Sequence, residues 1–151
     1  MKRAAELLPL SRQHHEALVL ARRASEPARA DPAALREQVL RRWSEHFEPH
    51  FAAEEEVLLV ALAAAGAGTE ASAAWEEHDA LRALVQRLRD GELECLPAWG
   101  DAMRAHVQWE ERHLFPLAER LLDLGPLASG LRTADERAAR AAPINERENR
   151  S

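Results

Sequence analysis

The stretch that organises this chain is FEPHFAAEEEVLL, residues 47–59. His50 and Glu54 stand four residues apart, so on a helix they lie one turn above each other on the same face. Phe47 and Phe51 lie on or beside that face, which directs an imidazole and a carboxylate toward an apolar core. Buried ionisable groups are costly unless they are paired, hydrogen-bonded or bound to a metal. The rest of the sequence should therefore supply partners for this pair.

Composition limits what kind of protein this is. The chain has 151 residues, 46% apolar and 30% charged, enough for one soluble domain with a core. It lacks an apolar run long enough to span a membrane or to form a signal peptide, and its net charge of −6 argues against general nucleic-acid binding. The single cysteine, Cys95, cannot form an internal disulfide, which suits a reducing cytoplasm. We therefore expect a cytoplasmic protein with no membrane or nucleic-acid partner.

The sequence predicts helices throughout, because Ala, Leu, Glu and Arg dominate and no sustained two-residue alternation occurs. Ser11 and Asp31-Pro32 are helix-start signals, and the glycines at 66, 68 and 91 are stop signals. Pro49 and Pro116 fall inside helical patterns and should kink or restart their helices. The expected helices are 11–25, 32–65, 69–90 and 96–124, with a short helix at 131–142 and a solvated tail beyond it.

Four long helices with short connections predict an all-α fold, an up-down-up-down antiparallel four-helix bundle. Residues 1–130 are expected to form the bundle and residues 131–151 a C-terminal helix or tail.

The chain also contains an internal repeat, which gives the bundle a pseudo-two-fold axis. Residues 13–18 resemble residues 77–81, and residues 50–55 resemble residues 106–111. Each half is thus a helix with one His followed by a helix with His-x-x-x-Glu. The repeat is expected to bring together His15, His50 and Glu54 from the first half with His78, His106 and Glu110 from the second.

Four neutral imidazoles and two carboxylates are suitable ligands for first-row transition metals. Carboxylates that bridge two ions hold them about 3.5–4 Å apart. Six protein ligands around two ions leave open positions for a small exogenous ligand such as dioxygen or hydroxide. The repeated pattern therefore favours a two-metal centre over a bundle with buried polar groups and no metal.

These motifs resemble the hemerythrin-like family, the His-His-Glu cation-binding bundles, over roughly residues 8–124. The resemblance rests on LSRQHHEAL at 10–18, His50-Phe51 with Glu54-Glu55, His78-Asp79 with Leu81, and residues 106–116 with His106, Glu110-Glu111 and Leu114-Phe115-Pro116. It implies a non-haem di-iron centre in which Glu54 and Glu110 bridge the ions and His15, His50, His78 and His106 complete the ligand set.

One position departs from the family. Its oxygen-carrying members have His-x-x-x-His on the third helix, whereas here Ala74 and Arg82 stand four residues before and after His78. One histidine of the five-histidine set is missing, which argues against reversible oxygen transport.

Several assignments stay open at this level. The repeat favours His15 over His14, although His14 fits an apolar stripe almost as well. His46 and His113 lie one turn from the core pattern and are either extra ligands or histidines at the rim. Glu55, Glu56 and Glu111 are expected to be solvated or to support the ligands. The four tryptophans either shield the site or pack in the core.

The resulting hypothesis is a non-haem di-iron protein that binds or senses dioxygen, nitric oxide or redox state, with zinc or manganese as alternative ions. The small partner would be a diatomic ligand or peroxide, and no protein partner is specified. The alternative is an iron(II)-oxidising or peroxide-consuming enzyme of the same fold, or an iron store. The sequence slightly favours a binding protein over an enzyme. It does not distinguish these functions, because all of them use the same metal ligands.

Overall fold

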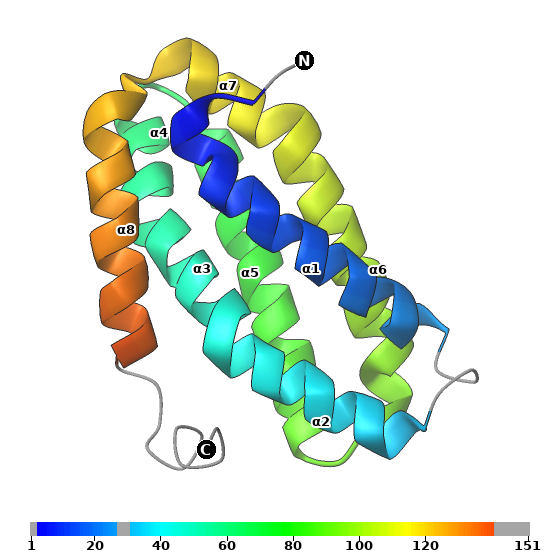
Figure 1. Ribbon diagram of the computed structural model, residues 1–151. Coiled ribbons are helices and arrows are strands. Elements are labelled where there is room, and N and C mark those ends of the chain that lie inside the picture. Colours follow the sequence, from blue (N-terminus) through cyan, green and yellow to red (C-terminus); the bar gives the residue numbers. More distant parts are fainter. Residues whose placement is uncertain (1–2, 27–30, 141–151) are drawn as a thin grey trace.

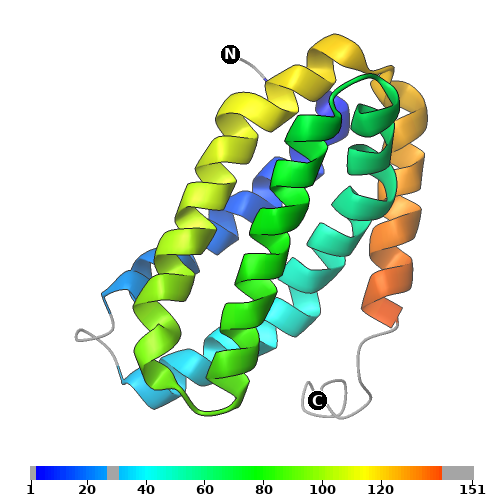
Figure 2. The ribbon, with the colours of Figure 1, turned by 180° about the vertical axis from the view of Figure 1, so that it is seen from behind.

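The computed structural model describes residues 3–26 and 31–140, and these residues form only helices and connecting turns. Four long helical stretches run antiparallel in the expected bundle, with a fifth helix along one side (Figures 1 and 2). The first stretch is α1 (Leu8–Ser25), preceded by η1 (Ala5–Leu7). The second comprises α2 (Pro32–Arg42), η3 (Trp43–Phe47), α3 (Glu48–Ala53), η4 (Glu54–Leu59) and α4 (Val60–Ala64). The third is α5 (Gly68–Arg89). The fourth, after η5 (Leu93–Cys95), comprises α6 (Leu96–Trp109), η6 (Glu110–Leu114) and α7 (Phe115–Leu121).

Several helix ends follow directly from local sequence. The carboxylate of Asp31 accepts a hydrogen bond from the Ala33 N–H at 3.1 Å, so Asp31 caps α2 as predicted. Gly66 and Gly91, with φ of 94° and 93°, follow the second and third stretches in the left-handed conformation that glycine accepts most readily. Ser11 was wrongly expected to be a cap: it lies inside α1, and its hydroxyl donates to Glu111 Oε2 at 3.1 Å.

Both prolines lie just beyond π-helical turns. The wider turn η3 ends at Phe47, two residues before Pro49, and η6 ends at Leu114, two residues before Pro116. A new α-helical segment restarts after each turn with the proline in its first turn, as expected. A proline in the first turn of a helical segment disturbs it least, because the N–H that proline lacks would have no partner within that segment.

The C-terminal helix is longer than the sequence indicated. The fourth stretch ends at Leu121, where the chain turns into the extended Leu122, and α8 (Leu124–Arg140) begins only two residues later. It contacts η1, α3 and η4, and it buries Leu131 and Ala134. It therefore spans the domain boundary expected at residue 130. The tail expected at 143–151 lies outside the described residues.

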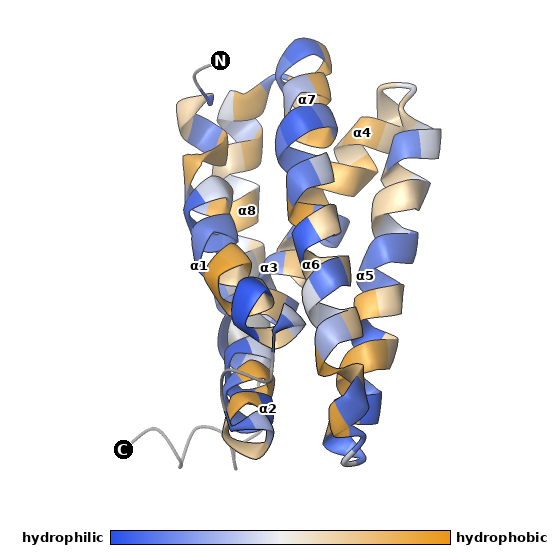
Figure 3. Ribbon diagram, turned by 90° about the vertical axis from the view of Figure 1, so that its right-hand side faces the viewer, coloured by the Kyte–Doolittle hydropathy of each residue, from blue (hydrophilic) through white to orange (hydrophobic). Residues whose placement is uncertain are grey.

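Each stretch of the bundle is amphipathic, with hydrophobic and hydrophilic residues alternating around the helices (Figure 3). The buried apolar residues form two clusters. One contains Leu20, Val39, Leu81 and Met103 among others, and the second contains residues such as Leu58, Ala74 and Phe115. Between them, each of the four stretches carries buried histidine or glutamate. The polar layer therefore lies within the core, enclosed at both ends by apolar packing.

Among the described residues, no helix is both long enough and apolar enough to cross a bilayer.

Candidate metal centre

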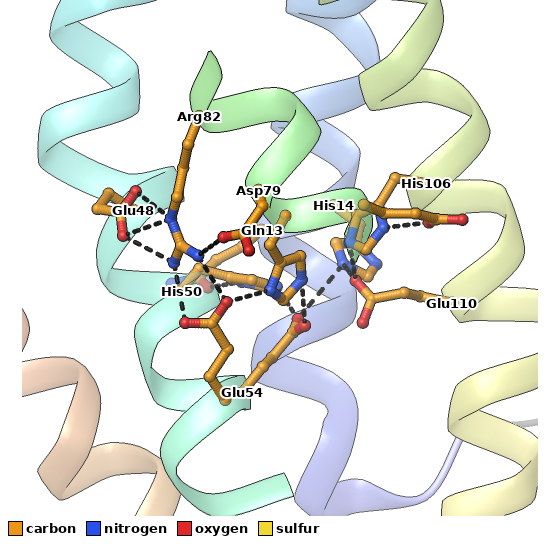
Figure 4. Close-up of polar contacts among 12 residues, drawn as sticks. Gln13, His14, Glu48, His50, Glu54, Asp79, Arg82, His106 and Glu110 are labelled. Carbon is orange, nitrogen blue, oxygen red and sulfur yellow. Dashed lines mark hydrogen bonds and ion pairs between the residues drawn. The ribbon is translucent and has the colours of Figure 1, made fainter. Parts of the chain in front are cut away.

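Six ionisable side chains from four antiparallel stretches converge at the centre of the bundle (Figure 4). All six are nearly inaccessible to solvent, with exposed fractions of 0–3%. They are His14 on α1, His50 on α3, Glu54 at the start of η4, His78 on α5, His106 on α6 and Glu110 at the start of η6. The two glutamates thus occupy equivalent places, each as the first residue of a π turn, a feature often found at functional sites.

These side chains divide into two groups that share both glutamates. One group, the first position, contains His14 and His50 with Glu54 and Glu110. The other group, the second position, contains His78 and His106 with the same two glutamates. Within each group, one ligand atom from every residue lies within 4.8 Å of the others. A carboxylate shared between two groups in this way is suited to bridge two ions.

The ring nitrogens that face the centre are the Nε2 atoms. The Nε2 of His106 lies 2.8 Å from Glu110 Oε1, and that of His14 lies 3.3 Å from the same oxygen. His78 Nε2 is 3.3 Å from Glu54 Oε2, and His50 Nε2 contacts Glu54 Oε1. The two histidines of each position therefore meet the shared carboxylates from different helices.

The outward-facing Nδ1 atoms all have partners on neighbouring helices. Each lies beside a carboxylate or amide oxygen, which fixes the ring orientation and, in the tautomer with hydrogen on Nδ1, leaves an unprotonated Nε2 facing the centre. The partners are Glu111 Oε1 for His14 at 3.0 Å, Gln13 Oε1 for His50, Glu55 Oε2 for His78 at 2.8 Å and Glu77 Oε1 for His106 at 2.6 Å.

Two arginines hold two of these partners in place. Arg82 donates to both oxygens of Glu55, at 2.8 and 2.9 Å, and also binds Glu48 and Asp79 (Figure 4). Arg3 binds the corresponding Glu111 at 3.2 Å. Because of Arg82 and His78, the pKa of the Glu55 carboxyl stays below its ordinary value despite burial.

The buried atoms that face the centre approach one another closely, but none has a partner in hydrogen-bonding geometry among the described residues. They comprise the Nε2 atoms of all four histidines and both oxygens of Glu54 and of Glu110. Buried polar atoms in native proteins nearly always have partners. Four nitrogens and four carboxylate oxygens converging without hydrogen bonds fit coordination of two first-row metal ions, which would satisfy them all.

Protonation of the histidines offers the metal-free protein another way to stabilise the buried charges. Burial opposes their charged form, but the neighbouring carboxylates outweigh it and raise the pKa of His14 to about 9, of His78 to about 8 and of His106 to about 10. The pKa of Glu110 is held well below its ordinary value by His106 and His14, although its burial acts in the opposite direction. A metal ion would therefore have to displace protons from these rings.

The structure reverses the expected choice between two neighbouring histidines. His14 is buried in the centre, whereas His15 is exposed and belongs to neither group. The repeat had been aligned one residue out of register: His14, not His15, corresponds to His78, and Gln13 corresponds to Glu77. His46 and His113 also lie outside both groups; His113 is exposed, and the His46 side chain is 39% exposed.

The residues around the third-helix histidine explain why it stands alone. Ala74, one turn before His78, is fully buried in the apolar core. Arg82, one turn after it, is engaged with Glu48, Glu55 and Asp79. Neither Ala74 nor Arg82 therefore adds a further imidazole beside His78.

Sequence reasoning did not fully identify the four residues that contact the Nδ1 atoms. Glu55 and Glu111 had been expected either to be solvated or to support the ligands, and the structure shows that they contact histidines of the centre. Gln13 and Glu77 were missed, although the corrected register would have placed both immediately before a histidine of the centre.

A small cavity of about 10 Å³ adjoins the first position. Its lining includes His14, His50 and Gln13, and its other walls are apolar, formed by Ala17, Phe47, Phe51, Met103 and Val107. That volume is close to the lower limit for one water-sized molecule.

The tryptophans divide between core and site. Trp43 and Trp99 are buried in the apolar core, and Trp75 is 42% exposed. The ring of Trp109 lies 6.4 Å from that of His106, so only this tryptophan lies beside a described histidine of the centre.

Comparison with known proteins agrees with this geometry. Residues 9–94, more than half of the chain, match the family model of the hemerythrin HHE cation-binding domain. No curated protein and no solved structure matches the chain. The matched region contains His14, His50, Glu54 and His78, and the structure adds His106 and Glu110 from the following helix. The chain therefore belongs to the hemerythrin HHE cation-binding domain family.

Proposed function

We propose that this protein holds two iron ions between its four helices and uses them to bind or sense a small diatomic ligand such as dioxygen or nitric oxide. The first ion would lie between His14 and His50, the second between His78 and His106, and Glu54 and Glu110 would bridge them. When bound, the ions would supply redox-active centres with coordination positions that the protein leaves open.

The observation that carries this proposal is the set of eight buried atoms that face one another without hydrogen bonds. Desolvation of these groups destabilises the fold, and metal coordination would offset that effect. The Nδ1 partners further support coordination, since they hold all four rings with Nε2 toward the centre.

The donor set favours iron. Imidazole suits iron, copper, nickel and zinc, whereas carboxylate suits harder ions, and mixed sets of both are typical of di-iron bundles. Each position offers four protein ligands. Four ligands can complete the tetrahedron that zinc prefers, whereas an iron ion with four protein ligands keeps room for an added ligand.

The cavity beside the first position supports a small ligand. Its volume of about 10 Å³ is near the lower limit for one water-sized molecule, so it excludes larger ligands, and most of its walls are apolar. The two groups of ligands share their carboxylates at a single buried centre, which fits two ions better than a store for many.

Metal analysis and visible spectroscopy of the full chain provide the test. The protein is loaded with iron(II) under nitrogen, desalted, analysed for iron and then exposed separately to air and to nitric oxide. We expect about two ions per chain and a reversible change in the visible spectrum with at least one gas. Colourless protein without iron after loading would refute the proposal.

The same samples distinguish the enzymatic alternative. Repeated additions of iron(II) or peroxide show whether the protein consumes many equivalents. Binding or sensing predicts a response that ends at stoichiometric ligand, whereas sustained consumption would assign an oxidising or peroxide-consuming enzyme.

A further inference from the structure

The supports of the two metal positions are related by the repeat, with one chemical difference. Glu55 and Glu111 occupy equivalent places and each lies beside the Nδ1 of a histidine in the other half of the chain. Gln13 and Glu77 are also equivalent, and each lies beside the Nδ1 of the histidine on the next stretch. Of these four supports, only Gln13 is neutral.

This difference affects how strongly the two positions bind metal. A carboxylate that accepts the Nδ1 hydrogen makes the imidazole a better donor through Nε2, whereas a neutral amide has a weaker effect. His50, supported by Gln13, is thus the weakest donor of the four. Because the Glu77 side chain is 40% exposed, solvent screens part of its charge, and we expect the low end of the usual 10–100-fold effect, about 10-fold.

A separate observation distinguishes the same position. Gln13 lines the small inner cavity at His14 and His50, and it also lines an outer cleft of about 100 Å³. That cleft lies between the N-terminal helices and α8, with Glu6, Leu10, Leu131 and Arg132 among its walls. Gln13 therefore stands between the outer surface and the first position.

The carboxylates beside His78 and His14 are both braced by an arginine. Arg82 binds Glu55 together with Glu48 and Asp79, and Arg3 binds Glu111 together with Glu119. The inequality between the two positions therefore rests on Gln13 and its counterpart Glu77.

We infer that Gln13 makes the two ion positions inequivalent. The His78–His106 position fills first and holds its ion tightly, whereas the His14–His50 position fills second and exchanges its ion past Gln13. This inference rests on the proposed two-ion function and adds to it an order of filling and the residue that sets that order.

Calorimetric titration of the metal-free chain with iron(II) under nitrogen tests it. Wild-type protein should bind two ions in two steps whose affinities differ by about 10-fold or more. Gln13→Glu should strengthen the weaker step by about 10-fold and bring the steps together, and Glu77→Gln should weaken the tighter step. The double variant Gln13→Glu/Glu77→Gln keeps the net charge unchanged and should restore two steps with the order of the positions reversed.

The order is assigned on single-position backgrounds. His50→Ala leaves the second position intact, and His106→Ala leaves the first intact. Gln13→Glu should alter binding on the His106→Ala background and leave it nearly unchanged on the His50→Ala background. Gln13→Met, of similar size but without an acceptor oxygen, should weaken the first position further, and circular dichroism confirms that each variant is folded.

The outcomes separate the two proposals. Failure of wild-type protein to bind iron would refute the proposed function itself. Two ions bound with equal affinity, or a folded Gln13→Glu variant with unchanged steps, would overturn the role of Gln13 and leave the two-ion function standing.

Discussion

The two halves of the bundle build the same arrangement from different residues. In each half, one helix supplies a single histidine and the next supplies His-x-x-x-Glu, with the glutamate at the start of a π turn. The first half, however, uses a neutral Gln13 where the second uses Glu77, and its inner cavity adjoins that residue. The comparison teaches that a repeated arrangement of histidines and glutamates can still be supported unequally, because the residues behind the histidines differ.

The largest effects should come from residues that the halves share. Glu54→Ala or Glu110→Ala removes a carboxylate common to both groups, so we expect the iron content to fall close to zero. Measurement of iron after anaerobic loading checks this. Glu56→Ala is the matched control, since Glu56 lies on η4, its side chain is 49% exposed and it belongs to neither group. Loss of only one ion from Glu54→Ala would show that the glutamates do not bridge.

Removing one histidine should affect one half only. His14→Ala takes a ligand from the first position and should leave about one ion per chain. His15→Ala changes an exposed neighbour and should leave about two ions bound. Metal analysis of the two variants compares adjacent residues directly, and the reverse result would return the ligand role to His15.

Ion binding to both halves should stabilise the fold, and more strongly at higher pH. Free ion at about 100 times the dissociation constant adds roughly 2.7 kcal/mol, about 5–10 °C in Tm for a domain of this size. The raised pKa values of His14, His78 and His106 stabilise the metal-free protein fully below about pH 6.5, and this contribution is lost as the pH rises through about 8 to 10. The Tm difference between loaded and metal-free protein should therefore increase from pH 6.5 to pH 9. Loaded and metal-free protein with the same melting temperature at each pH would contradict this coupling.

The arginines that support each half should have smaller effects. Arg82→Met frees Glu55 and should weaken the second position by about 10-fold, whereas Arg3→Met frees Glu111 and should weaken the first by a similar factor. Stepwise iron(II) titration resolves the two effects. Arg87→Met on the same helix as Arg82, where Arg87 pairs with Glu92, should leave both steps unchanged. An equal effect of Arg87→Met would indicate a general influence of charge.

Much of the fold could be predicted because it depends on local sequence patterns. The helical period, the Asp31 cap and the glycines at 66 and 91 depend on residues close in sequence. The helix α8 was only partly predicted, because Gly125-Pro126 suggested a stop, whereas packing against α3 and η4 allows the helix to begin there. Burial of Leu131 and Ala134 is a tertiary effect that composition does not reveal.

The sequence by itself determined the helical bundle and five of the six residues that meet at its centre. It could do so because His-x-x-x-Glu places two groups one turn apart whatever surrounds the helix. Tertiary structure alone decided between His14 and His15, since neighbouring residues point about 100° apart and only the packed orientation of α1 selects the inward one. It also decided which side chains stand behind the histidines, because these partners come from different helices, and their distances depend on how the helices pack.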